Sequence, residues 1–247
     1  MTDDRITAAL TEAIATACRV MAAGGLVEHV LGHISARAGD HHLLVRCRGP
    51  REAGLSRTRP EDIKLVPIQG PAGDLDGWTP PNELPIHTGV LRRRPEVTAV
   101  AHAHPPAVVT HSLLDEPLLP VYGAYDIPGA RMAAGGIPVW SRSALVTTDE
   151  LAGAMAEAMG DRPVVVLRGH GVVSAAGGDD PVAAVRTAVL QAFALDTLAR
   201  VTLAVRQAGG TPRAIGDDDL AGLPDLGGGF NVETMWRHLL TRLPAAD

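Results

Sequence analysis

Two histidines stand one residue apart where an apolar, β-branched run of residues ends. They are His102 and His104, in the segment VTAVAHAHPP at 97–106, and the two prolines stop the run. Because side chains alternate between the two faces of a strand, both imidazoles project from the same face, close enough to share a ligand. This spacing indicates a metal site, although an H-x-H pair also occurs by chance as a structural pairing.

A third histidine, His170, lies between two glycines in the segment LRGHGVV. Glycine neighbours remove two side chains, so a metal or a substrate can approach closely. Three neutral imidazoles that leave coordination positions open are typical of a catalytic divalent-metal site rather than a structural one. Five isolated histidines are instead interpreted as surface or hydrogen-bonded structural residues: His29, His41, His42, His111 and His238.

An acidic residue precedes the H-x-H segment. The stretch TPPNELPIHTGVLRRRP, residues 79–95, carries turn residues, a plausible helix cap at Asn82 and then a helical pattern. Within that helix, Glu83 and His87 are four residues apart and therefore share one face.

The elements that would position these residues alternate between helix and strand, with no internal repeat. The predicted strands are 41–46 (HHLLVR), 63–68 (IKLVPI), the H-x-H run, and two pieces on either side of 169–171. The predicted helices cover 5–23, a segment from a Thr147/Glu150 capping box to Gly160, a long segment from a cap at Asp180 to the glycines at 209–210, and a short one over 232–243. Strands at both hairpin and helix-separated spacing favour a layered α/β domain with a mixed or antiparallel sheet.

The composition limits the classes of function. The chain has 247 residues, 46% of them hydrophobic, which suffices for one large folded domain. The net charge of −6 provides no basic field for nucleic acid. Cys18 and Cys47 match neither a disulfide framework nor a zinc ribbon, so both are predicted to be buried thiols. Lys64 is the only lysine and lies in a predicted strand, so Schiff-base chemistry is disfavoured.

No stretch of the sequence has the pattern of a leader peptide, and no apolar run reaches the roughly 18 residues needed to span a bilayer. The chain is therefore predicted to be cytoplasmic, to act on a small-molecule substrate, and to have no membrane or nucleic-acid partner.

Three segments, taken in order, resemble the class II aldolase and adducin family: GLVEHVLGHISAR, NELPIHTGVLRRRPEVTAVAHAHP and LRGHGVV. The order E-x-x-x-H, H-x-H-P and H-G is a specific combination, and the resemblance extends over roughly residues 5 to 208. It implies a three-layer α/β/α fold with a mainly antiparallel central sheet, and a homotetramer with sites at the subunit interfaces. We expect one domain over 1–247, with 211–247 as a C-terminal extension that serves as a lid or an interface.

The resemblance also implies a divalent metal ion held by His102, His104 and His170. It places the family's acidic residue, which touches the metal or transfers protons, on Glu83. Zinc is the expected metal, and iron, manganese and cobalt are alternatives, because imidazole ligands suit all four.

Two segments depart from the sugar-phosphate aldolases of this family, which resemble G-N-x-S in the first loop and S-S-E before the acid. Here the loop reads Gly32-His33-Ile34-Ser35, and Pro81-Asn82 replaces the double serine before Glu83. A substrate phosphate would lose an amide and two hydroxyls, each worth about 1–3 kcal/mol to a buried charged partner. Sugar-phosphate cleavage is therefore disfavoured, whereas the metal chemistry is unaffected.

The segments GHISAR, RCRGPREAGLS, PPNELPIH and GAYDIPGARMA are more similar to the branch of the family that decarboxylates hydroxylated aromatic acids such as dihydroxyphthalates. A phenol oxygen and an adjacent carboxylate suit the open positions of the metal, while Arg48 or Arg51 would bind a second carboxylate or else be solvated in its loop. Ser35 and Tyr125 are further candidate substrate-binding residues, with Tyr125 acting across a subunit boundary.

We therefore expect a metal-dependent carbon-carbon lyase in which the metal stabilises charge on the phenol oxygen and Glu83 protonates the ring carbon. That role requires a raised Glu83 pKa or an intervening water; if Glu83 is instead ionised and metal-bound, His33 becomes the rival acid. His33 otherwise satisfies backbone groups in its loop, and His87 either supports the site or packs. Two other functions stay open: retro-aldol cleavage of a sugar phosphate or hydroxy-keto acid, and a non-catalytic module like the adducin head.

Overall fold

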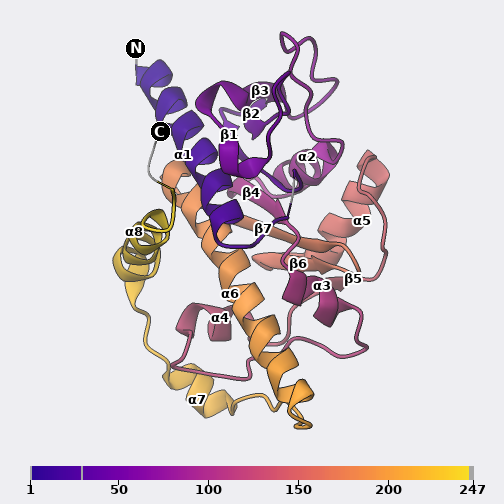
Figure 1. Cartoon of the computed structure of the whole chain (residues 1–247), viewed down its shortest axis with the longest axis vertical. Helices are drawn as coiled ribbons and strands as arrows, with labels where there is room; N and C mark the ends of the chain where they lie inside the picture. The colour runs from indigo at the N-terminus through magenta and orange to yellow at the C-terminus, as the bar shows by residue number, and fades with distance from the viewer. Residues whose placement is uncertain (1, 29, 245–247) are drawn as a thin grey trace.

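A seven-stranded sheet forms the centre of the fold (Figure 1). The computed structural model describes residues 2–28 and 30–244, with side chains from residue 7 onward. The strand order is β3-β2-β1-β4-β7-β6-β5, and neighbouring strands are antiparallel except for the parallel β5–β6 pair. The strands are β1 His33–Ala38, β2 His42–Arg46, β3 Ile63–Pro67, β4 Val97–Ala103, β5 Val139–Trp140, β6 Val164–Leu167 and β7 Gly171–Gly177.

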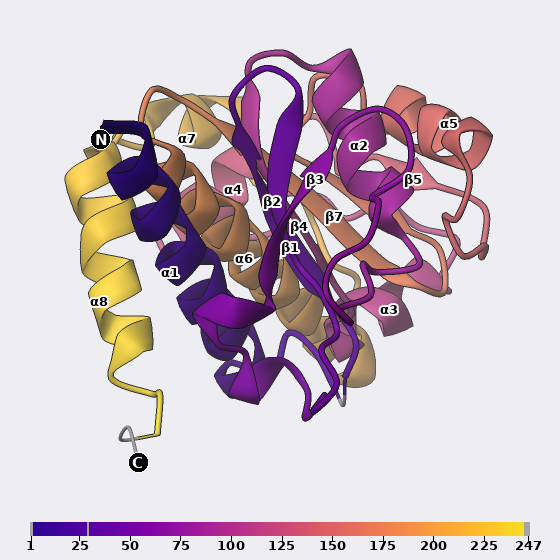
Figure 2. The same cartoon turned by 90° about the horizontal axis from the view of Figure 1, so that it is seen from above.

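Helices cover both faces of the sheet, which gives three layers (Figure 2). One layer contains α1 Thr2–Ala23, α3 Pro106–Ser112, α4 Ile127–Met132 and α6 Pro181–Gln207. The other contains α2 Leu84–Arg93 and α5 Asp149–Met159, which pack on each other and on the sheet. Each layer encloses its own apolar cluster. The predicted α/β/α fold with a mainly antiparallel sheet is confirmed.

Alternation along β4 decides which way its histidine faces. Ala99, Ala101 and Ala103 belong to the apolar cluster on the side of α1 and α6, whereas Val100 belongs to the cluster on the side of α2 and α5. His102 shares the face of Val100 because it lies two residues further along the strand. It therefore faces the layer that carries α2.

The starts of α6 and α5 test two of the predicted helix caps. Asp180 caps α6 as predicted, because its side chain accepts hydrogen bonds from the backbone N–H groups of Val182 and Ala183. The cap of α5 is Thr148 rather than Thr147, with the Thr148 hydroxyl accepting from the N–H of Leu151.

The start of α2 also differs from the prediction. The residue at the cap position is Glu83 rather than Asn82, and the Glu83 side chain does not bond to the helix backbone. The carboxylate accepts instead from the N–H of Val146, far away in the sequence. Asn82 accepts from a guanidinium N–H of Arg48, so its side chain is engaged outside the helix.

Helix α6 is the one described helix that is long and apolar enough, by length and composition, to cross a membrane. Charged residues such as Arg186 and Asp196 interrupt its apolar run, so the sequence shows no continuous apolar span there. In the fold, α6 packs against β4, β7 and α1, as a core helix does.

The C-terminal segment runs back along the surface of α6. It contains α7 Asp217–Gly222, then a π-helical turn over Gly229–Thr234 and α8 Met235–Leu240. Trp236 and Leu239 of α8 are buried against the core cluster around α6. An ion pair of 2.6 Å joins Arg186 Nη1 to Glu233 Oε1.

Candidate metal centre and the adjoining pocket

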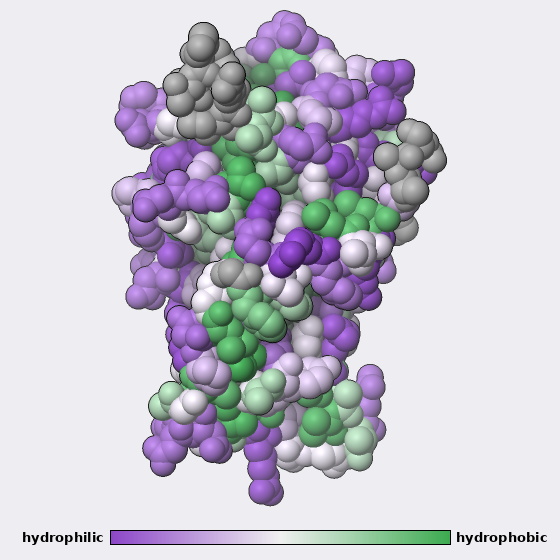
Figure 3. Space-filling model, turned by 90° about the vertical axis from the view of Figure 1, so that its left-hand side faces the viewer, coloured by the Kyte–Doolittle hydropathy of each residue, from purple (hydrophilic) through white to green (hydrophobic). Residues whose placement is uncertain are grey.

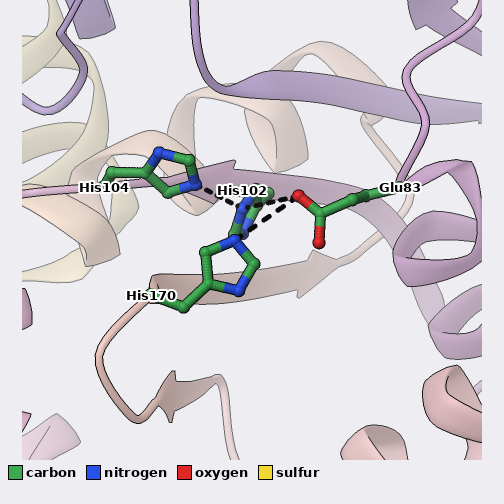
Figure 4. Close-up of side chains that lie close together, drawn as sticks. All are labelled: Glu83, His102, His104 and His170. Atoms are coloured by element: carbon green, nitrogen blue, oxygen red, sulfur yellow. Dashed lines mark hydrogen bonds and ion pairs between the residues drawn. The ribbon is translucent and has the colours of Figure 1, made fainter. Parts of the chain in front are cut away.

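Four potential ligand side chains converge at one end of β4 (Figure 4). One ligand atom from each of Glu83, His102, His104 and His170 lies within 4.8 Å of the other three. The Nε2 atoms of His102 and His104 are 2.7 Å apart, and Glu83 Oε2 is 3.5 Å from His102 Nε2 and 3.4 Å from His170 Nε2. The structure thus brings together all four residues that the sequence singled out.

The glycines around His170 act differently from the way expected. Gly169 has a φ of +63°, which turns the chain from β6 into β7 and which favours glycine. A Cβ atom on Gly171 would lie 2.3 Å from the carbonyl oxygen of Ala103. The missing side chain therefore lets β7 approach the end of β4 and brings His170 next to His104, rather than opening room for a ligand.

Hydrogen bonding fixes the tautomer of His102. Its Nδ1 atom is 3.0 Å from the carbonyl oxygen of Val172, an acceptor that requires a proton on Nδ1. The Nε2 atom then carries a lone pair and points into the cluster. Burial, reinforced by neighbouring His104, holds the pKa of His102 well below its usual range, and burial lowers the pKa of His104 to about 4.

Glu83 is buried at the cluster and is ionised there. Burial alone would raise its pKa, but hydrogen bonds that the carboxylate accepts from His170 and from the Val146 N–H outweigh that effect and lower it. The pKa is thus shifted opposite to what direct proton donation by Glu83 requires. Neutral imidazoles and one carboxylate are ligands that a divalent transition metal accepts, so the residues present fit such an ion.

His33 does not lie in an irregular loop as expected, because it is the first residue of β1 and pairs directly with His102 on β4. The two rings are tilted, with centroids 5.0 Å apart. Burial, followed by the charge of His87, holds the pKa of His33 well below its usual range. His33 is therefore neutral near pH 7, which weakens its expected role as the rival acid.

Behind His33 lie His87 and Ser35, both fully buried. His87 Nε2 is 2.7 Å from His33 Nδ1, and His87 Nδ1 is 2.7 Å from Ser35 Oγ. Burial lowers the pKa of His87 to about 4, against opposing effects of the Glu83 carboxylate and the Val100 carbonyl. Ser35, expected to touch substrate, contacts His87 instead and does not line the pocket.

A pocket of about 130 Å³ opens beside the cluster, lined by His33, Arg46, Arg48, Glu83, His104 and Leu145 among others. Arg48 lies at the pocket as expected and is held by its bond to Asn82. Arg46 was not predicted. It is buried, its guanidinium pairs with Glu52, and its Nε atom has no hydrogen-bond partner among the described residues.

A sequence signal for Arg46 existed in the segment RCR. Arg46 ends β2, so Arg46 and Arg48 continue the same two-residue period that relates His102 to His104. Only Arg48 and Arg51, which follow β2, were predicted to bind a second carboxylate or else to be solvated in their loop.

Two expected substrate-binding residues lie away from the pocket. Arg51 is exposed and absent from the pocket lining. Tyr125 is 74% exposed and packs edge-on against Tyr122. Within one chain the structure brings neither residue to the cluster, and a contribution of Tyr125 across a subunit boundary stays a prediction.

A second cavity, of about 490 Å³, lies between the end of α1, α3 and α6. It is larger than the pocket beside the cluster, but it shares no lining residue with it. Its polar groups include Asp196 and Arg200, which form an ion pair with each other. The converging titratable groups, rather than cavity size, identify the functional site.

Known proteins resemble this chain in sequence and in fold. The family model described as "Class II Aldolase and Adducin N-terminal domain" matches residues 12–203. The chain is 55% identical to a 3,4-dihydroxyphthalate decarboxylase of Arthrobacter keyseri, over 95% of this chain and 94% of that protein. It is 50% identical to a protein of the same name from Terrabacter sp. (strain DBF63), over 96% and 98%. The solved L-fuculose 1-phosphate aldolase of Glaciozyma antarctica PI12 superposes with a TM-score of 0.74 at 22% identity, covering 95% of this chain and 89% of that one.

Proposed function

The chain belongs to the class II aldolase and adducin family, and from this premise we propose that it is a divalent-metal-dependent decarboxylase of 3,4-dihydroxyphthalate or a closely related hydroxylated aromatic acid. The observation that carries the proposal is a sequence identity of 49–55% to three proteins named 3,4-dihydroxyphthalate decarboxylase, over nearly the whole chain. The likeness to the sugar-phosphate aldolase, at 22% identity, concerns the fold alone.

His102, His104 and His170 are the residues that would hold the metal ion, and the Glu83 carboxylate lies beside them. A bound divalent cation supplies a Lewis acid for the electrons released when the carbon-carbon bond breaks. The identity of that ion, with zinc as our first choice before iron, manganese and cobalt, is a matter for elemental analysis of the purified protein.

Two arginines would orient a dianionic substrate in the pocket. Arg46 and Arg48 both line it, and the unpartnered Nε–H of Arg46 is a donor without a protein acceptor. A guanidinium binds a carboxylate through charge-assisted hydrogen bonds, which are stronger than neutral ones. We assign these residues to the carboxylate that stays on the ring, because the carboxylate that leaves must lie close to the metal centre.

Glu83 is the group placed to move the proton that decarboxylation needs. Its carboxylate would accept the phenol proton as the substrate binds and return it to the ring carbon, while the bond to the carboxylate breaks and carbon dioxide leaves. The bonding electrons restore the aromatic ring, and water supplies the phenol proton when the product departs. This route agrees with a Glu83 that is ionised before substrate binds.

Homotetramer formation, with sites at subunit interfaces, is also part of the proposal. The face that carries α1 and α8 is mostly hydrophilic but is interrupted by apolar patches (Figure 3). Exposed apolar residues of the C-terminal segment include Leu226, Phe230 and Met235, and Val30 and Leu31 are exposed at the pocket rim. Such patches are typical of surfaces that another chain covers. We propose that the chain forms one domain, in which residues 211–247 are a C-terminal extension that serves as a lid or an interface. We also propose that the protein works in the cytoplasm.

Product analysis tests the function. Metal-replete protein is incubated with 3,4-dihydroxyphthalate, and carbon dioxide and the monocarboxylate product are measured; fuculose and ribulose phosphates are assayed in parallel for aldehyde release. We expect carbon dioxide release from the aromatic acid alone. Efficient cleavage of the sugar phosphates, with no turnover of the aromatic acid, would assign the site to the aldol reaction. Absence of both activities would favour a non-catalytic module.

A further inference from the structure

Three buried side chains form a hydrogen-bonded row that leads to the pocket. Ser35 Oγ contacts His87 Nδ1 at 2.7 Å, and His87 Nε2 contacts His33 Nδ1 at 2.7 Å. Ser35 and His87 are fully buried, while His33 lines the pocket. Because His33 Nδ1 is occupied by His87, its Nε2 atom is the ring nitrogen left for the pocket.

The hydroxyl of Ser35 sets the direction of this row. Its only hydrogen-bond partner among the described residues is His87 Nδ1. If Ser35 accepted a proton from His87, its own O–H group would be buried without an acceptor, which is unfavourable. We therefore infer that Ser35 donates to His87 Nδ1, with the Val100 carbonyl as a competing acceptor for the His87 proton. A neutral His87 then carries its proton on Nε2 and donates it to His33 Nδ1.

We propose that Ser35 and His87 hold His33 in the tautomer that carries its proton on Nε2, so that a neutral N–H group faces the pocket and donates to an anionic oxygen of the bound ligand. The three residues share this task unequally: His33 would touch the ligand, and Ser35 and His87 are positioning residues. The identity of the ligand oxygen, a carboxylate or phenolate of a hydroxylated aromatic acid, rests on the proposed function.

The opposite tautomer would make the pocket less suitable for an anion. It would present a lone pair of His33 in the pocket that the Glu83 carboxylate also lines, and the ligand would meet two acceptors there. With the proton on Nε2, His33 adds a third donor to those of Arg46 and Arg48. The row thus makes His33 attract an anionic ligand rather than repel it, while the His33 ring stays neutral.

Nuclear magnetic resonance tests the tautomers directly and needs no substrate. In zinc-loaded, histidine-labelled protein, nitrogen shifts distinguish a protonated ring nitrogen from a bare one, and His33→Gln and His87→Gln variants identify the signals. We expect the proton on Nε2 in both His33 and His87. Finding it on Nδ1 in either residue, for example because His87 donates to the nearby Val100 carbonyl, would overturn the proposal.

Substitution of Ser35 tests the cause. Ser35→Ala should move part of the His33 proton to Nδ1 and lower kcat/KM for 3,4-dihydroxyphthalate about tenfold, which corresponds to about 1.4 kcal/mol. Ser35→Thr keeps the hydroxyl and should keep both properties. Ser174→Ala is the matched control, since Ser174 is equally buried but bonds to Gln191.

Two results separate the failure of this inference from failure of the proposed function. Unchanged tautomers and unchanged kinetics in Ser35→Ala would show that the hydroxyl only fills space, and the inference would be wrong. If the predicted tautomers are found but the protein does not turn over the aromatic acid, the row is supported and the substrate assignment fails.

Discussion

Glu83 Oε2 lies 3.4 Å from His170 Nε2, although 87 positions separate the two residues in the chain. The same carboxylate is anchored through its other oxygen, Oε1, by the backbone N–H of Val146. One oxygen is thus held by the scaffold, and the other faces the imidazoles. Three distant segments must fold correctly before this arrangement exists, so it is a sensitive target for substitution.

The first prediction concerns metal binding. His170→Ala should reduce the bound divalent metal from one ion per chain to a small fraction and lower decarboxylation by more than the roughly 10–100-fold that loss of a group supporting a ligand costs, because a ligand itself is removed. Elemental analysis after gel filtration measures the metal. His170 lies in a turn, so the melting temperature of the metal-free form should change little.

His41→Ala is the control for that experiment. His41 is exposed in the turn between β1 and β2, at the opposite end of β1 from His33. It should retain full metal and full activity. Full metal occupancy in His170→Ala would remove this residue from the ligand set.

The second prediction separates the charge of Glu83 from its hydrogen bond. Glu83→Gln keeps an oxygen that accepts from the Val146 N–H but loses the carboxylate base. We expect kcat to fall by about a hundredfold to ten-thousandfold, the range of a positioned acid or base, while the fold is retained. Steady-state kinetics and a urea melt measure the two properties.

Glu83→Ala serves for comparison, because it removes both the base and the acceptor for Val146 N–H. It should lose stability as well as activity, since a buried N–H is left unpaired. Equal activity in wild-type and Glu83→Gln protein would show that Glu83 only holds the loop around Val146.

The sequence singled out the three candidate metal-ligating histidines because local periodicity and spacing place them. His102 and His104 follow from the two-residue period of a strand, and the position of His170 follows from the break between two strands. Their convergence does not follow from period alone, because it depends on the pairing of β4 with β7. The convergence is implied instead by the family resemblance, and the family model that matches residues 12–203 confirms that resemblance.

The residues that were misplaced depend on contacts made across the fold. Ser35 was predicted to bind substrate because its segment GHISAR resembles the aromatic-acid decarboxylase branch, but its side chain contacts His87. Arg46 was missed because a buried arginine is rare without a partner, and its partner Glu52 lies in the irregular segment after β2. No local pattern shows either contact.

The third prediction concerns specificity. Arg46→Gln should lower kcat/KM for 3,4-dihydroxyphthalate by about ten- to a hundredfold, because one charge-assisted hydrogen bond to the retained carboxylate is worth about 1.5–3 kcal/mol. It should have little effect on 2,3-dihydroxybenzoate, which lacks a second carboxylate. Competition between the two substrates measures the difference.

Removal of Arg46 also leaves Glu52 without its partner, so the double variant Arg46→Gln/Glu52→Gln controls for that charge. Arg51→Gln is the surface control and should behave as wild type, because Arg51 does not line the pocket. If Arg51→Gln impaired the enzyme and Arg46→Gln did not, the carboxylate would be bound elsewhere, for instance at a subunit interface.

The fourth prediction concerns the two cysteines, which are buried free thiols as the sequence indicated. Burial raises the pKa of Cys18 to about 12 and that of Cys47 to about 12. Thiol reagents attack the thiolate, so both residues should resist alkylation at pH 8 in the native protein and react after denaturation. Mass spectrometry of the labelled protein measures this protection.

The same pKa shift makes stability depend on pH in alkaline solution. In the unfolded chain the Cys18 thiol has its usual pKa of 9.0, whereas burial in the folded protein raises this pKa to about 12. Between these values the folded state binds more protons, so the free energy of unfolding falls as pH rises. From pH 8 to pH 10 we expect a loss of about 1 kcal/mol for Cys18, measured by urea unfolding. Cys18→Ala should be less stable at pH 8 because of the cavity it leaves. Between pH 8 and pH 10, however, its free energy of unfolding should fall by about 1 kcal/mol less than that of the wild type. Equal losses in both proteins would mean that Cys18 ionises alike in the folded and unfolded states.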